Sequence, residues 1–210
     1  MKAPGTEVYN ALMELYLFDV NTLIGREDEA LSRLSPGRRE KARRLLRSSP
    51  RLLSIGAGLL IARFFPGREP LVAPGGKPYV PGGPEFSLSH SGALAVIALA
   101  DVPVGADAEQ DRPTDETLRL RVLTGAERAD ASRDLLFFWT RKEAALKCLG
   151  TGLDRELALL DVRGDSMALD GRTIFLHTAR YGSYYLSAAA DGRPADFVPR
   201  ELTLDQLLEA

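Results

Sequence analysis

Four residues in the second half of the chain have the types and spacing that a metal-dependent reaction on phosphate needs. Asp107 and Glu109 are two positions apart, and Glu143 and Lys147 are four apart. Three carboxylates can form an oxygen-only pocket of the kind that Mg²⁺ accepts while it keeps waters for phosphate oxygens. A lysine beside that pocket supplies a compact positive charge for the phosphate itself. Together these residues predict phosphoryl-group chemistry.

The elements that carry the four residues must bring them onto facing surfaces. On an extended strand alternate residues point to one side, so Asp107 and Glu109 would project together. On a helix, Glu143 and Lys147 lie one above the other. Each pair also has an ordinary interpretation, as the solvated edge of a strand and as a helix-surface ion pair worth a few tenths of a kcal/mol.

The pattern of apolar and turn-forming residues predicts a mixture of strands and helices. Strands are expected at Val8–Val20, Lys77–Val80, Phe86–Ser89, Ala93–Ala100, Val104–Ala108, Leu157–Val162, Arg172–His177 and Tyr184–Ala189. Helices are expected at Arg26–Leu34, Gly37–Arg47, Arg51–Arg63, Asp115–Val122, Ala126–Arg133, Asp134–Leu149 and Leu204–Leu208. The rest of the segment from Pro66 to Pro84 is rich in Pro and Gly and is expected to be a loop.

One stretch of the first half is echoed in the second. Residues Ala95–Asp101 and Tyr185–Asp191 are both Ala-rich apolar runs that end in Asp, and each follows a helix-rich segment. Two related halves joined near Ala100–Val104 would give this pattern. Because alanine-rich runs are common, chance explains the echo as well as duplication does.

A second candidate region is strongly basic. Its seven basic residues within fourteen positions are Arg38, Arg39, Lys41, Arg43, Arg44, Arg47 and Arg51. A solvated helix face or a nucleic-acid patch would explain them, but the net charge of −2 gives no overall attraction to nucleic acid. His90 lies in a serine-rich stretch after a predicted strand, which is rich in donors for anions.

Composition excludes several other classes. The chain has 210 residues, 45% of them hydrophobic, and one cysteine, so an internal disulfide is not possible. No run approaches the roughly 20 apolar residues of a membrane helix, and the start lacks the apolar core of a signal peptide. We therefore expect a cytoplasmic protein. Two histidines and one cysteine do not make a typical zinc site, and neither a Gly-x-Ser-x-Gly elbow nor a phosphate-binding Gly-rich loop ending in Lys-Ser/Thr is present.

Several motifs in order resemble the 4′-phosphopantetheinyl transferases, of the surfactin-synthetase-activating type. The matching blocks are Gly76-Lys77-Pro78, Phe86-Ser87-Leu88-Ser89-His90-Ser91, Gly105-x-Asp107-x-Glu109 and Trp139-x-x-Lys142-Glu143-Ala144-x-x-Lys147-x-x-Gly150-x-Gly152-Leu153. The resemblance implies an α+β fold built as a pseudo-symmetric pair of similar α/β halves. The halves would be residues 1–102 and 103–210, with the metal site in the second.

The resemblance also implies the reaction and its residues. The enzyme would move the 4′-phosphopantetheine arm of coenzyme A to a serine of an acyl or peptidyl carrier protein, releasing adenosine 3′,5′-bisphosphate. Mg²⁺, or Mn²⁺ in its place, would lie on Asp107, Glu109 and Glu143. Glu143 would also be the base, and Lys147 would neutralise the phosphate. The residues expected to bind coenzyme A are Lys41, Arg44, Arg51, Lys77, Ser89, His90 and Lys142.

The expected partners are coenzyme A and the carrier protein, with neither nucleic acid nor membrane, and the enzyme is expected to be a monomer. The carrier could serve fatty-acid, polyketide, nonribosomal-peptide or lysine-pathway chemistry. Its docking surface is expected in the segment from Arg112 to Arg128, although the apolar residues there could equally face the core. Two other functions stay open: another Mg²⁺-dependent nucleotide phosphotransferase or hydrolase, and an inactive homologue that only binds coenzyme A or a carrier.

Overall fold

The computed structural model describes residues 13–152, 156–192 and 196–209. It has a mixed α/β architecture with two four-stranded sheets and a two-stranded hairpin. In chain order the elements are β1 (Glu14–Asp19), η1 (Val20–Leu23), α1 (Glu27–Arg33), α2 (Pro36–Arg44), α3 (Ser48–Phe64), β2 (Leu71–Val72), β3 (Pro78–Tyr79), β4 (Glu85–Ser91), β5 (Leu94–Ala100), β6 (Val104–Gln110), α4 (Glu116–Val122), α5 (Gly125–Ala129), α6 (Leu135–Leu149), η2 (Leu157–Leu159), β7 (Ser166–Leu169), β8 (Arg172–Tyr181), β9 (Tyr184–Asp191), β10 (Pro199–Glu201) and α7 (Leu204–Leu208). Over the described ranges, no helix combines the length and apolar character that crossing a membrane requires.

The first sheet has the strand order β10-β1-β5-β4. Strand β5, which lies between β1 and β4, is apolar and buried at every position. This is the pattern of a strand with both faces covered. Ala95, Ile97 and Leu99 pack toward the helices α1 to α3, and the residues between them pack toward the second sheet. The expectation of a buried strand at Ala93–Ala100 is therefore confirmed.

The second sheet has the order β6-β9-β8-β7 and is antiparallel throughout. The long helix α6 packs across β6 and β9. A third apolar cluster, which includes Phe138 and Leu146 of α6 and Ile174 of β8, fills the space between this helix and the sheet.

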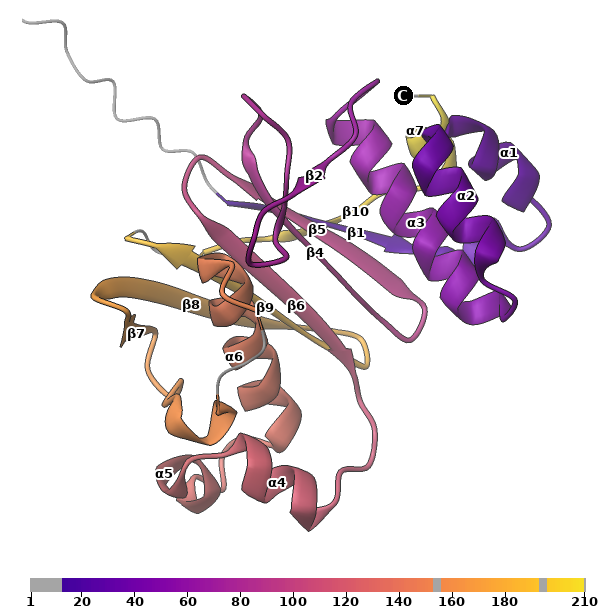
Figure 1. The fold of residues 1–210 in the computed structure, drawn as a ribbon. Helices are drawn as coiled ribbons and strands as arrows, with labels where there is room; N and C mark the ends of the chain where they lie inside the picture. Colours follow the sequence, from indigo (N-terminus) through magenta and orange to yellow (C-terminus); the bar gives the residue numbers. More distant parts are fainter. Residues whose placement is uncertain (1–12, 153–155, 193–195, 210) are drawn as a thin grey trace, which may run out of the picture.

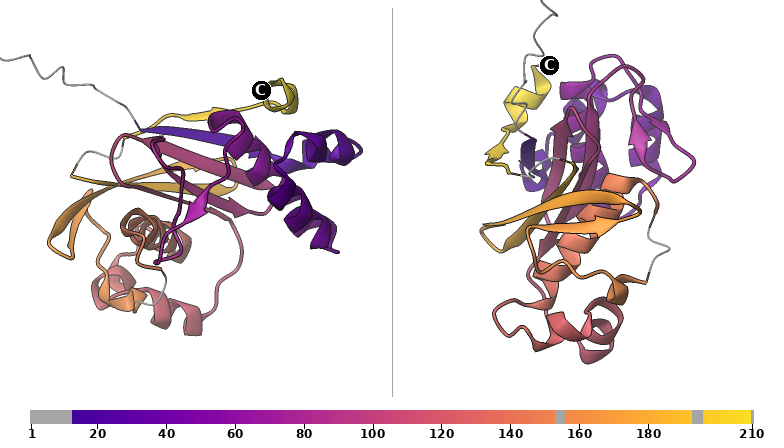
Figure 2. Two further views of the ribbon diagram at one scale, coloured as in Figure 1. Left: turned by 45° about the horizontal axis from the view of Figure 1, so that its top comes forward. Right: turned by 90° about the vertical axis from the view of Figure 1, so that its left-hand side faces the viewer.

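The two sheets share a core that is lined by small side chains. Its alanines, from the three strands β5, β6 and β9, are Ala98, Ala100, Ala106, Ala108, Ala188 and Ala190. Figures 1 and 2 show the result: α1 to α3 lie at one end of the molecule, α4 to α6 at the other, and the strands between them. Because β4 lies against β6, the edges of the two sheets also meet.

The end of the chain returns to the first sheet. Strand β10 pairs in parallel with β1, and Leu204, Leu207 and Leu208 of α7 belong to the core under α3. Residues of the predicted second half, 103–210, thus complete the core of the first. The division at 102/103 stays a prediction, and so does the pseudo-symmetry of the halves.

Two sequence-based assignments in the second half were wrong. The strand expected at Leu157–Val162 is the short helix η2 followed by an irregular segment, because side chains satisfy its backbone. Lys142 donates to the carbonyl of Leu157, and Glu127 accepts from the N–H of Val162. The helix expected to reach Arg133 ends at Ala129. The expected opening strand is seen as β1, and its residues 8–12 lie outside the described part of the chain.

Candidate active site

Strand β6 presents its acidic residues as the alternation predicts. Ala106 and Ala108 face the core between the sheets, and Asp107 and Glu109 lie on the opposite face. Asp107 is buried, whereas Glu109 is partly exposed at the end of the strand.

Gly105 lets helix α6 approach this face of the strand closely. A Cβ atom at Gly105 would lie 1.9 Å from the carbonyl oxygen of Ala144 and 2.4 Å from the amide nitrogen of Cys148. Only a residue without a side chain fits there. Helix α6 itself runs from the N-cap at Asp134 to the C-cap at Gly150, whose left-handed φ of 68° ends the helix. The close contact brings Glu143 and Lys147 to the acidic strand.

Lys147 and Asp107 form the centre of the site. The Nζ atom of Lys147 lies 2.5 Å from Oδ1 of Asp107 and 3.2 Å from Oγ of Ser89. Burial raises the pKa of Asp107, and the charge of Lys147 opposes that shift. The second oxygen, Oδ2, is buried without a hydrogen-bond partner among the described residues. A buried carboxylate oxygen without a donor is chemically suited to a cation.

Glu143 lies one turn before Lys147 on the same helix and is only 7% exposed. Burial, with the negative charge of Asp107 as the next cause, raises its pKa to about 7. Near neutral pH the carboxyl group is therefore close to half protonated. Buried carboxyls with such raised values are common at catalytic sites.

Two of the three acidic side chains form ion pairs in this structure. Glu109 lies 2.5 Å from the guanidinium of Arg112, as Asp107 does from Lys147. Across residues 13–152, 156–192 and 196–209, no three His, Cys, Asp or Glu side chains are gathered closely enough to hold a metal ion. The donor chemistry of the three carboxylates fits a divalent cation, but binding would require Lys147 and Arg112 to turn aside.

A cleft of about 640 Å³ joins the acidic site to the basic segment. Its polar lining residues are Arg38 and Lys41 of α2, Ser54 of α3, Ser89 and His90 of β4, Asp107 and Glu109 of β6, and Lys147 of α6. Four of the eight predicted coenzyme A and phosphate residues, namely Lys41, Ser89, His90 and Lys147, thus line one cavity with two of the carboxylates. The volume is in the range of small-molecule sites.

The sequence did not single out Arg38 and Ser54. Arg38 is three residues before Lys41, so the two share one face of α2, and that spacing is the signal that could have selected it. Burial lowers the pKa of the Arg38 guanidinium. Ser54 gave no sequence signal, but its Oγ atom is buried without a partner among the described residues.

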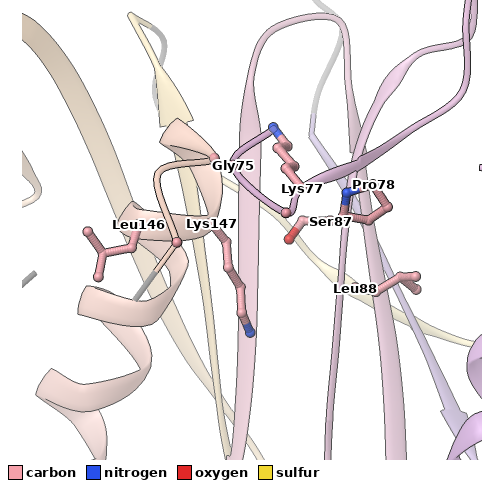
Figure 3. Close-up of a pocket in the computed structure, with 10 residues that line it drawn as sticks. Gly75, Lys77, Pro78, Ser87, Leu88, Leu146 and Lys147 are labelled. Atoms are coloured by element: carbon pink, nitrogen blue, oxygen red, sulfur yellow. The ribbon is translucent and has the colours of Figure 1, made fainter. Parts of the chain in front are cut away.

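A neighbouring pocket of about 330 Å³ contains Lys77. Lys147 and Leu88 line both cavities. Figure 3 shows the side chains of Lys77 and Lys147 extending in opposite directions. The amino group of Lys77 donates to Glu85 at 3.0 Å and to the carbonyl of Cys148 at 3.3 Å. Lys77 therefore lies next to the cleft and ties the loop that carries it to the end of α6.

The remaining predicted residues lie apart from the cleft. Arg44 is exposed and pairs with Glu40 on its own helix. Arg51 lies in the first turn of α3 and does not line the cleft. Its Nε atom is buried without a hydrogen-bond partner among the described residues.

Lys142 does not fit its predicted role in binding coenzyme A. Its side chain is 0% exposed and forms an ion pair at 2.5 Å with Glu127, which is equally buried. It also donates to the carbonyls of Val122 and Leu157. These contacts tie α4, α5 and η2 to α6, so the structure gives Lys142 a scaffold role.

Comparison with known proteins is consistent with this geometry. A model of the 4′-phosphopantetheinyl transferase superfamily matches residues 103–198, which include the acidic strand and α6. A 4′-phosphopantetheinyl transferase of Bacillus subtilis is 30% identical over 158 residues, covering 66% of this chain and 70% of the relative. The 4′-phosphopantetheinyl transferase psf-1 of Bacillus pumilus is 37% identical over 98 residues, 42% of each chain. The chain therefore belongs to the 4′-phosphopantetheinyl transferase superfamily, a class of transferase enzymes.

Proposed function

We propose that this enzyme transfers the 4′-phosphopantetheine arm of coenzyme A to a serine hydroxyl of an acyl or peptidyl carrier protein and releases adenosine 3′,5′-bisphosphate. The names of both Bacillus relatives support the transferred group. The observation that carries the proposal is the shared cleft, in which Arg38 and Lys41 of α2 lie across from Asp107 and Lys147. A ligand with phosphates at two places suits such a cavity.

The basic face of α2 would bind the 3′-phosphate, and His90 and Lys147 would bind the diphosphate. Charge-assisted contacts to phosphate are each worth about 1.5–3 kcal/mol. Lys41→Ala should therefore weaken binding of coenzyme A about tenfold or more and leave binding of dephospho-coenzyme A nearly unchanged. Calorimetric titration with both ligands measures this difference. Equal losses for both would show that Lys41 does not contact the 3′-phosphate.

The carboxylates of Asp107, Glu109 and Glu143 would hold the divalent cation, Mg²⁺ or Mn²⁺. When bound, the ion would supply positive charge to the diphosphate as its bond breaks. Lys147 would donate to a phosphate oxygen and offset the same charge. This requires its ammonium to leave Oδ1 of Asp107, which is 2.5 Å away.

The transfer itself exchanges one phosphorus–oxygen bond for another. The serine oxygen of the carrier forms a bond to the β-phosphorus, and the bond from that phosphorus to the bridging oxygen breaks. Adenosine 3′,5′-bisphosphate leaves with the electron pair. Glu143 would take the serine proton, since a carboxyl group with a pKa of about 7 can accept a proton near neutral pH.

The carrier would dock beside the acidic end of the cleft. Helix α4 follows β6 in the chain and exposes Leu120, which is 55% exposed, between Arg119 and Arg121. Val122 and Leu123 face the core instead. An acidic helix of a carrier protein would find here one apolar contact with a basic rim.

Intact-mass analysis tests the transferred group directly. Candidate apo-carriers are incubated with the enzyme, coenzyme A and Mg²⁺. The correct carrier should gain the mass of one phosphopantetheine group, and a carrier whose acceptor serine is replaced by alanine should not. Failure of every fatty-acid, polyketide and nonribosomal-peptide carrier tested to gain that mass would contradict the proposal.

A further inference from the structure

Three serines of β4 connect the edges of the two sheets. Ser87, Ser89 and Ser91 alternate along the strand, so their side chains share one face. Each hydroxyl oxygen accepts a hydrogen bond from a backbone N–H of β6, namely those of Ala106 at 3.0 Å, Ala108 at 3.3 Å and Gln110 at 3.0 Å. The three hydroxyl groups thus provide hydrogen-bond acceptors for backbone N–H groups along the edge of β6, where another strand would otherwise pair.

Two of the three serines also hold a carboxylate. Ser89 donates to Oδ1 of Asp107 at 2.7 Å, and Ser91 donates to Oε2 of Glu109 at 3.1 Å. In each case the carboxylate belongs to the residue that directly precedes, in the chain, the residue whose backbone N–H donates to the same serine. At the position of Ser87, the corresponding residue is Gly105, which has no side chain. The hydroxyl of Ser87 therefore accepts from β6 as the other two do, but it has no carboxylate to hold.

The hydrogen-bonding capacity of Ser89 is used completely by these contacts. A serine hydroxyl has one hydrogen and two lone pairs. Ser89 gives its hydrogen to Asp107 and accepts from the N–H of Ala108 and from Lys147. In this arrangement it has no hydrogen left for a phosphate of coenzyme A, and the expected contact of Ser89 with that ligand stays a prediction.

We propose that Ser89 and Ser91 are positioning residues that fix the orientation of Asp107 and Glu109 for the divalent cation. This inference rests on the proposed function. Each serine is held by the backbone of β6 and in turn holds a carboxylate oxygen, which leaves the other oxygen directed elsewhere. For Asp107 that other oxygen is the buried Oδ2, which has no hydrogen-bond partner in the described part of the chain. Residues that orient metal ligands in this way typically change metal affinity 10–100-fold when they are removed.

The test compares Ser91→Ala with Ser87→Ala. Both variants remove an acceptor for one N–H of β6, but only Ser91→Ala removes a hydrogen bond to a carboxylate. Ser87 is more buried than Ser91. If the serines served only to hold the two strands together, Ser87→Ala should therefore have at least as large an effect as Ser91→Ala. Mn²⁺ is titrated into each protein with saturating coenzyme A, and free Mn²⁺ is measured by electron paramagnetic resonance. Thermal melts confirm that each variant is folded.

Ser91→Ala should weaken Mn²⁺ binding about tenfold, the lower end of the range for such residues. Ser87→Ala should stay within about twofold of the unaltered protein, and Ser91→Thr, which keeps the hydroxyl, should recover most of the affinity. Unchanged affinity in folded Ser91→Ala, or an equal loss in Ser87→Ala, would overturn the inference. If the unaltered protein binds no Mn²⁺ beyond that held by coenzyme A alone, the proposed cation site itself fails.

Discussion

The chemistry of the site depends on two buried carboxyl groups in different surroundings. Asp107 has a lysine and a serine on one oxygen, so its charge is balanced within the protein. Burial, and after it the negative charge of Asp107, raises the pKa of Glu143 to about 7. The sequence predicted both residues from their spacing, but spacing does not reveal which one is neutralised and which one gains a proton.

Asp107→Asn should reduce transfer more than about 100-fold, because the amide cannot supply the negative charge that the cation and Lys147 require. The fold should persist, since the amide oxygen can still accept from Ser89. Asp111→Asn is the matched control, because Asp111 is an exposed aspartate that pairs with Arg180 just after the same strand. Initial rates with saturating coenzyme A measure both variants. Near-normal transfer by folded Asp107→Asn would place the cation site elsewhere.

The raised pKa of Glu143 predicts a pH-dependent difference in stability. In the unfolded chain this carboxyl titrates near 4.5, and in the folded protein near 7. The stability that the protonated group contributes is complete below pH 4.5 and is lost as pH rises through 7. Glu143→Gln never ionises, so between pH 5 and pH 8 its unfolding free energy should rise relative to that of the unaltered protein by about 2–3 kcal/mol.

Urea unfolding of both proteins at the two pH values, with chelator present, measures this gain. Comparing the two proteins cancels the other titrating groups. A difference in unfolding free energy that does not change with pH would mean that Glu143 titrates normally.

At the scale of elements, the sequence predicted what local pattern encodes. The apolar run of β5, the alternation of β6 and the helical stretch Asp134–Leu149 each identify an element from neighbouring residues, and each was confirmed. The environment of Lys142 could not be predicted in this way. Its partner Glu127 lies on another helix, and nothing in the local pattern distinguishes a lysine in a buried ion pair from one in a ligand site.

Gly105→Ala tests the contact between β6 and α6. The added methyl group would meet the backbone of Ala144 and Cys148 rather than a flexible side chain, so α6 must shift. We expect a loss of at least about 2 kcal/mol in unfolding free energy and a large fall in transfer, because Glu143 and Lys147 move with the helix. Urea unfolding and initial rates measure the two effects.

Gly125→Ala is the control for this variant. Its methyl group would meet only a nitrogen of the Arg128 side chain, at 3.8 Å, and alanine suits the start of helix α5. It should unfold no more easily than the unaltered protein. A Gly105→Ala protein of unchanged stability and rate would show that the two elements are not packed as closely as described.

At the scale of the molecule, the cleft needs both sheets and the helices on either side of them. The basic face comes from α2, the acidic strand from β6, and His90 from β4 between them. The family resemblance predicted related halves, the echo between Ala95–Asp101 and Tyr185–Asp191 being explained equally well by chance, and that relation stays a prediction. The parallel pairing of β10 with β1 was not predictable, because it joins residues about as far apart in the chain as its length allows.

Carrier docking is a property of the assembled surface. Replacing Arg119 and Arg121 with Glu should raise the KM for the carrier several-fold and leave the KM for coenzyme A unchanged, because rim charges steer association. The effect should shrink at high salt, where such charges are screened. Replacing Arg33 of α1 and Arg63 of α3 with Glu changes the total charge by the same amount in helices at the other end of the molecule, and this variant is the control. If both constants stay the same, the carrier docks elsewhere.

The central claim is that bond cleavage in coenzyme A is coupled to modification of a carrier. The most direct measurement is the amount of adenosine 3′,5′-bisphosphate released with and without apo-carrier, set beside the amount of carrier that gains mass. We predict one bisphosphate for each carrier modified and no release without the carrier. Release in the absence of any carrier would instead indicate a hydrolase of nucleotide pyrophosphate bonds and would contradict the account.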